Sequence, residues 1–117
     1  MNVNARQAMM FKLSERFSPT PGPRYISEGD WSGELLRKSI LLEIVKNAIE
    51  KNETLCVDLD GTHGYGTSFL EEVFGGLIRE DKLTLNQLRK HLTFISDEEP
   101  YLISDINEYM EDAHNDK

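Results

Sequence analysis

Cysteine is almost absent from this chain of 117 residues, which has only Cys56. A single thiol excludes an intramolecular disulfide and fits a reducing compartment. Long hydrophobic runs are also missing, since no stretch of about 20 apolar residues is present to span a bilayer. The segment Met1–Met10 lacks the basic stretch and apolar core of a secretory signal. We therefore expect a cytoplasmic protein with no membrane span.

An excess of positive charge is missing as well. The chain has 13 Lys and Arg against 21 Asp and Glu, a net charge of -8. Because such a chain repels phosphates, we expect no binding to DNA or RNA. Many of the acids lie in the last quarter of the chain: Asp97, Glu98, Glu99, Asp105, Glu108, Glu111, Asp112 and Asp116. They indicate a solvated helix face and tail, or else a surface that docks onto a basic partner.

The length and the hydrophobic pattern predict one α/β domain over residues 1–117, with residues 1–7 and 112–117 as flexible tails. The expected order is β-β-α-β-α-β-α, a small mixed sheet of about four strands with helices packed on it. Strands are expected at 8–13, 24–27 (an edge strand), 54–60 and 91–96, and helices at 32–51, at 68–78, at 82–90 (a short helix or turn) and from Pro100. The apolar run Leu55-Cys56-Val57 predicts a central strand covered on both faces.

Paired carboxylates follow that strand, in Asp58-Leu59-Asp60-Gly61-Thr62. This run resembles the first motif of haloacid dehalogenase-type phosphatases. The resemblance implies that Asp58 is a nucleophile, that Asp60 handles the leaving-group proton, and that both help to hold Mg²⁺. Such carboxylates suit a hard cation and phosphoryl transfer. The opposing interpretation is that both aspartates simply form a turn, because the other strands and the lysine that such a phosphatase needs are not evident.

The loop Gly61–Gly66 joins the strand to a helix N-terminus, where backbone N–H groups favour anions. Its glycine spacing matches neither the dinucleotide fingerprint nor a P-loop. It therefore predicts a small-ligand or nucleotide site less well than a tight turn that needs positive φ angles.

Thr67 and Ser68 begin the next helix. Ser68 and Glu71 have the spacing of a capping box, so Ser68 is expected to cap the helix. Both hydroxyls are also phospho-acceptor candidates, because the helix dipole stabilises a phosphate there. Further along, Gly75-Gly76 inside the helix indicates close packing, either internal or against another protein. The three histidines share no metal-ligand spacing, and we expect no metal and no cofactor.

Four segments together resemble the STAS-like domain of unknown function found in prokaryotes: Arg16-Phe17; Ser32-Gly33-Glu34 with Arg37; Val57–Gly61; and Thr67–Leu77. STAS domains are named for sulphate transporters and anti-sigma factor antagonists. The resemblance implies a small α/β fold. It also implies a histidine-kinase-like ATPase partner, which phosphorylates a serine at the start of the helix after a central strand. Ser68 takes that position, with Thr67 just before it. Gly66 and Phe69 depart from the antagonist pattern, which usually has an acidic residue and a glycine there.

We therefore interpret the chain as a non-enzymatic regulatory domain that binds a protein partner. The alternatives are the Mg²⁺-dependent phosphatase and the ligand sensor described above, and the sequence leaves a homodimer open. Besides Thr67 and Ser68, the residues expected at the partner or ligand surface are Asp60, Gly61, Gly64, Tyr65, Gly66, Glu71, Glu72 and Gly75.

Overall fold

The computed structural model describes residues 6–116 and contains one sheet of three parallel strands. The strand order follows the chain, with β1 (Arg6–Lys12), β2 (Glu53–Asp58) and β3 (Leu92–Ile95) side by side. β2 pairs with both neighbours, so it is the central strand, as its apolar sequence predicts. The sheet is therefore purely parallel and three-stranded, and the expected mixed sheet of about four strands is wrong.

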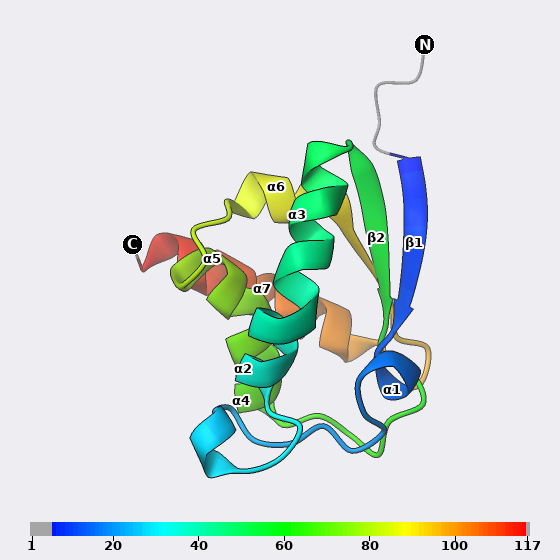
Figure 1. The fold of residues 1–117 in the computed structure, drawn as a ribbon, viewed down its shortest axis with the longest axis vertical. Helices are drawn as coiled ribbons and strands as arrows, with labels where there is room; N and C mark the ends of the chain where they lie inside the picture. Colours follow the sequence, from blue (N-terminus) through cyan, green and yellow to red (C-terminus); the bar gives the residue numbers. More distant parts are fainter. Residues whose placement is uncertain (1–5, 117) are drawn as a thin grey trace.

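Five helices pack on this sheet (Figure 1). Two of them are long and contain a π-helical segment in the middle. Their parts are α2 (Gly33–Leu36), η2 (Arg37–Leu41) and α3 (Leu42–Glu50) in the first, and α4 (Thr67–Leu70), η3 (Glu71–Gly75) and α5 (Gly76–Arg79) in the second. The others are α1 (Leu13–Arg16), α6 (Leu85–His91) and α7 (Tyr101–Asn115).

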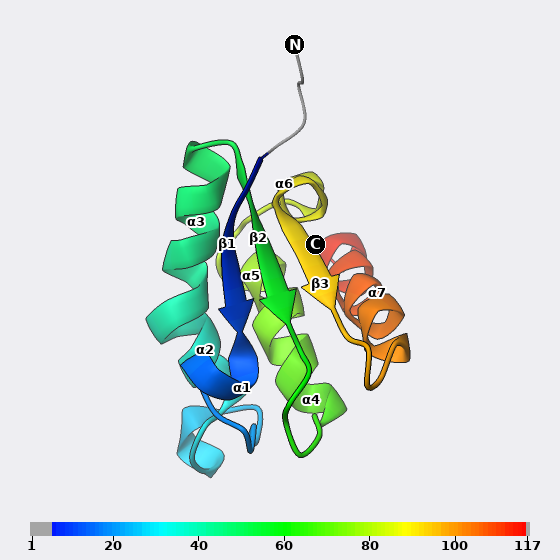
Figure 2. The same cartoon turned by 90° about the vertical axis from the view of Figure 1, so that its right-hand side faces the viewer.

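In the view of Figure 2 the two long helices lie behind the sheet, while the strands point downward and the chain moves from left to right. This arrangement makes both β-α-β crossovers right-handed, as parallel strands require. α7 flanks β3 and packs against η3 and α5. The second long helix therefore lies between the first long helix and α7.

Alternation along the strands separates the two faces of the sheet. The rows Met9–Leu55–Leu92 and Phe11–Val57–Phe94 face the helices, and most of these side chains belong to the hydrophobic core. The rows Met10–Cys56–Thr93 and Lys12–Asp58–Ile95 face the other way. No helix of the described residues covers that second face (Figure 2). Thr54 and Cys56 on that face of β2 are nevertheless only 8% and 4% exposed, so β2 is buried on both faces as expected, although helices pack on one face only.

The expected edge strand at 24–27 is also wrong, because the chain there forms a 3₁₀ turn, η1 (Ile26–Glu28). Carboxylates satisfy the backbone N–H groups that a strand would need for pairing. The Tyr25 N–H donates to Glu28 at 2.9 Å, and the Ile26 N–H donates to Glu34 at 3.0 Å. Because these backbone N–H groups already donate to side-chain carboxylates, they are not available for hydrogen bonds to a neighbouring strand.

Regular elements extend into both segments that we predicted to be flexible tails. β1 begins at Arg6, and α7 continues to Asn115 with Ala113 buried against the core. Residues 1–5 and Lys117 lie outside the described residues. Within residues 6–116, no helix has the length and apolar character needed to cross a membrane.

Candidate functional site

The carboxyl ends of the three strands meet at one edge of the sheet, because the strands are parallel. In open α/β sheets this edge is where ligands bind. β1 ends at Lys12, β2 at Asp58 and β3 at Ile95. The residues singled out in the sequence lie in the loop after β2 and in the helix that follows it.

Asp58 and Asp60 both have partners that hold the strand ends together. The Asp58 carboxylate lies 3.3 Å from Lys12 Nζ and accepts the Asp60 N–H at 3.0 Å. The Asp60 carboxylate accepts the N–H groups of Asp97 and Glu98 at 3.1 and 3.0 Å. The two aspartates thereby join β1, β2 and the loop after β3. No group of three metal-ligating side chains occurs within residues 6–116.

The glycine loop Gly61–Gly66 has the backbone that a tight turn requires. Gly61 has φ +92° and Gly64 has φ +128°, in a region that L side chains rarely adopt. A Cβ on Gly61 would lie 2.8 Å from Ser14 Oγ, so this position is also closely packed. Gly64 and Gly66 have open space around them. The loop is therefore tightly packed at its start and exposed further along.

Backbone donors of this loop are already used within the protein. The Gly61 N–H donates to the Glu98 carboxylate at 2.8 Å, and the His63 N–H donates to the Pro19 carbonyl at 2.8 Å. The Gly64 N–H donates to the Thr62 hydroxyl at 3.3 Å. A phosphate cradle needs several such donors free. This arrangement favours a structural turn over a nucleotide site.

Tyr65 anchors the loop to the core. Its hydroxyl donates to the Leu59 carbonyl at 2.8 Å, and its ring lies 6.0 Å from the Phe69 ring. Burial raises the pKa of Tyr65, and the nearby charges of Asp58 and Asp60 raise it further. The phenol therefore stays protonated and keeps donating at neutral pH.

The second long helix begins without a side-chain cap. Its N-cap is Gly66, with φ −76° and ψ 150°, and Thr67 and Ser68 are the first two helical residues. The expected capping box of Ser68 and Glu71 is therefore wrong, because Ser68 lies two positions past the cap. Thr67 and Ser68 are both exposed. Their hydroxyls form no hydrogen bond with other side chains in the described part of the chain.

Glu71 and Glu72 lie one turn further along the helix from Ser68 and belong to an ion-pair network. Arg24 and Arg79 both bind Glu71, and Arg37 binds Glu72 at 2.8 Å. Burial by itself raises the pKa of Glu71, but the hydrogen bonds from Arg79 and Arg24 outweigh it and bring that pKa below its ordinary value. The Glu72 side chain is only 3% exposed. Glu72 is thus unavailable at the surface where we expected it.

Internal packing explains Gly75 and Gly76. A Cβ on Gly76 would lie 2.5 Å from Arg37 Nε, and a Cβ on Gly75 would overlap the Glu71 carboxylate and approach the Tyr109 carbonyl to 3.4 Å. Both glycines are buried, so Gly75 does not face a partner in this structure. The pair makes room for the charged side chains that join the two long helices.

Sequence reasoning missed a group of exposed apolar residues in the loop between Gly22 and Gly33. Tyr25, Ile26 and Trp31 are 46%, 50% and 46% exposed. The Trp31 ring packs edge-on against Phe17 at 5.5 Å, and Phe17 lies 6.3 Å from Phe69. The signal available in the sequence was large apolar side chains inside a Pro- and Gly-rich loop, where no core explains them.

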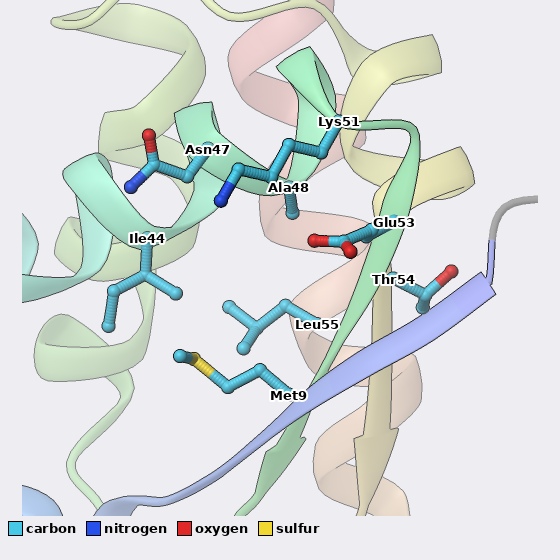
Figure 3. Close-up of a pocket in the computed structure, with 8 residues that line it drawn as sticks. All are labelled: Met9, Ile44, Asn47, Ala48, Lys51, Glu53, Thr54 and Leu55. Atoms are coloured by element: carbon cyan, nitrogen blue, oxygen red, sulfur yellow. The ribbon is translucent and has the colours of Figure 1, made fainter.

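A largely apolar slot lies at the opposite end of the sheet (Figure 3). It has a volume of about 150 Å³, and the side chains of Met9, Ile44 and Leu55 point toward one another in it. Lys51 and Glu53 lie at its rim. None of the residues singled out in the sequence lines this slot, so it is separate from the candidate site.

A family model described as the STAS-like domain of unknown function (DUF4325) matches residues 32–102. The chain belongs to this family. Neither a curated protein nor a solved structure matches it. The STAS-like match begins at Ser32, the N-cap of the first long helix, and ends at Leu102 in the first turn of α7. It covers β2, β3 and both π-helical segments, and it leaves out β1 and Trp31.

Proposed function

We propose that this STAS-like chain is a non-enzymatic regulatory domain that binds a protein partner and is switched by phosphorylation at Ser68 or Thr67. The observation that carries the proposal is the exposure of both hydroxyls in the first turn of a helix, directly after a glycine turn at the end of the central strand. A kinase can reach such hydroxyls without unfolding the domain.

The first turn of this helix also favours the phosphorylated form. The amides at a helix N-terminus have no acceptor inside the helix, and the helix dipole stabilises an anion there by about 0.3–1 kcal/mol. A phosphate adds roughly −1.5 to −2 charges at neutral pH. The nearest acid on the same helix face, Glu71, is already paired with two arginines. A new phosphate at Ser68 therefore meets less repulsion than the sequence alone suggests.

The family resemblance supplies the class of kinase, a histidine-kinase-like ATPase that is also the binding partner. The test is incubation of the chain with such an ATPase and ATP, followed by mapping of phosphate by mass spectrometry. We expect phosphate at Ser68 or Thr67, and we expect Ser68→Asp to weaken binding of the ATPase. Ser104→Ala is the matched control, since Ser104 is an exposed serine on α7. Absence of phosphate together with unchanged binding by Ser68→Asp would contradict the switch.

The contacts of Asp58 and Asp60 favour this proposal over the phosphatase. Asp60 accepts two backbone N–H groups, and Asp58 is paired with Lys12, so neither carboxylate is poised as a nucleophile. The decisive assay uses a generic phosphate ester with Mg²⁺. Hydrolysis that Asp58→Asn abolishes would overturn the non-enzymatic proposal. Thermal stabilisation of the chain by a nucleotide would instead favour the sensor.

A further inference from the structure

The loop between Gly22 and Gly33 is held rigidly at its base. Gly22 N–H donates to the Trp31 carbonyl, and Gly33 N–H donates to the Pro23 carbonyl, both at 2.9 Å. Gly22 also lies so close to the Asp30 carbonyl that a Cβ has no room. The loop contains η1 and is the light-blue segment at the lower end of Figure 1. It therefore presents its side chains in a fixed arrangement, which lowers the entropy lost on binding.

Tyr25, Ile26 and Trp31 form an apolar surface on this loop, which we name the Trp31 surface. They account for three of the six large hydrophobic side chains that are exposed among the described residues. Trp31 has φ +56°, which is unusual for a bulky residue and marks a position held by its surroundings. Residues with such unfavourable backbone conformations cluster at ligand-binding and other functional sites.

A hollow of about 350 Å³ lies within this surface. It is lined by Ile26, Gly29, Asp30, Trp31, Ser32 and Leu35. Its walls are apolar on the Ile26, Trp31 and Leu35 sides, and it is large enough for a single aliphatic side chain. Trp is among the side chains that most often dominate binding energy at protein interfaces, and Trp31 lines this hollow while half exposed.

Asp30 is the charged residue among those that line the hollow, and Glu28, two residues before it, is also exposed. Neither carboxylate forms a salt bridge with a residue that the structure describes, and Glu28 accepts the Tyr25 N–H. Trp31 can also receive a cation over its ring. We propose that the Trp31 surface binds a protein segment in which an aliphatic side chain is flanked by Lys or Arg. A second copy of this chain fits poorly, because its net charge is -8. This inference concerns the unphosphorylated chain and does not depend on Thr67 or Ser68.

Fluorescence gives a direct test, because Trp31 is the only tryptophan of the chain. The probe is a short synthetic peptide with a Leu-Leu pair flanked by lysines, compared with the same pair flanked by serines or by glutamates. We expect the lysine peptide to shift Trp31 emission to the blue and to saturate, because binding covers the ring. We also expect its affinity to fall with added salt. Equal binding of the glutamate peptide, or no saturable change with any peptide, would overturn the proposal.

Variants separate the apolar contribution from the charged one. Ile26→Ser is expected to weaken binding of the lysine peptide by about tenfold, which corresponds to the loss of one aliphatic contact. Glu28→Gln with Asp30→Asn is expected to remove the preference for lysine over serine flanks. Tyr101→Ser is the matched control, since Tyr101 is 57% exposed on α7, away from this loop. Wild-type binding by Ile26→Ser would overturn the proposal. So would an emission shift that depends on protein concentration without peptide, because it would identify a second copy as the occupant.

Discussion

Arg37 and Glu72 form a buried ion pair that joins the two π-helical segments, with 2.8 Å between Nη2 and Oε2 and both side chains 3% exposed. Arg37 also binds Asp81 at 2.8 Å. Glu72 lies within 3.5 Å of Arg79 as well. π-helical turns are rare and are often found at functional positions. Here the pair links the first long helix to the second, whose first turn carries Ser68.

Removal of one partner of this pair should destabilise the domain strongly. Glu72→Leu leaves the buried Arg37 guanidinium with one carboxylate fewer, and we expect a loss of about 3–5 kcal/mol in the free energy of unfolding. Arg37→Met together with Glu72→Leu should recover part of that loss, because both members of the buried pair are removed, while Asp81, which is 16% exposed, loses its partner Arg37. Urea unfolding of the single and double variants measures both effects. As a control, Lys38→Met breaks an exposed pair with Glu34 and should cost less than about 1 kcal/mol.

Gly76→Ala should destabilise the domain although alanine is the better helix former. Propensity alone predicts a gain of about 1 kcal/mol. The new Cβ would, however, lie 2.5 Å from Arg37 Nε, and overpacking of this kind costs about 1–3 kcal/mol. We expect a net loss in thermal unfolding. In the Arg37→Met background the loss should shrink, because the shorter, uncharged side chain can move aside. An equal loss in both backgrounds would disprove the steric explanation.

Local sequence patterns predicted the parts of the fold that depend on neighbouring residues. The apolar run at 55–57 identified the central strand. A helix was expected over 32–51, and the first long helix has Ser32 as its N-cap, which accepts the Leu35 N–H at 3.0 Å. The edge strand at 24–27 failed because Glu34, further along the chain, satisfies a donor there. The buried ion pair of Arg37 and Glu72 could not be predicted from local patterns either, since 35 residues separate the two positions in the sequence.

For the candidate site, too, the sequence predicted local features but not the contacts between distant residues. The spacing of Ser68 and Glu71 fits a capping box, but the helix begins at Thr67 with Gly66 as its N-cap, and Glu71 binds Arg24 and Arg79 instead. A pattern cannot show which of two partners a carboxylate will choose. The position of Trp31 depends on a loop closed by contacts between its two ends, and no local pattern marks it as a surface.

Ser68→Ala should leave stability unchanged within about 0.5 kcal/mol, because exposed positions outside caps and networks tolerate substitution. Gly66→Asp should instead stabilise the domain by about 0.5–1 kcal/mol, since it supplies an N-cap oxygen and reduces the conformational freedom of the unfolded chain at a φ of −76° that Asp adopts readily. Guanidinium unfolding of both variants distinguishes the two roles. A loss of about 1 kcal/mol for Ser68→Ala would show that Ser68 caps the helix after all.

Stability should fall in acid as the network around Glu71 is broken. The pKa of Glu71 is lowered in the folded state, because the hydrogen bonds from Arg79 and Arg24 outweigh the opposing effect of burial. A depressed pKa contributes stability that is complete above the unfolded value, near 4.5, and is lost as pH falls through the folded value. We therefore expect the free energy of unfolding to decrease below about pH 4.5.

Glu71→Gln provides the check on this assignment. It removes the titrating group, so the variant should be less stable than the wild type at neutral pH and its stability should change less between neutral pH and the acid region. Urea unfolding across this range measures the slope. Glu108→Gln is the matched control, since Glu108 is an exposed acid on α7. If Glu71→Gln kept the full acid slope of the wild type, carboxylates other than Glu71 would have to supply it, and Arg24 and Arg79 would be bound to Glu71 without stabilising the fold.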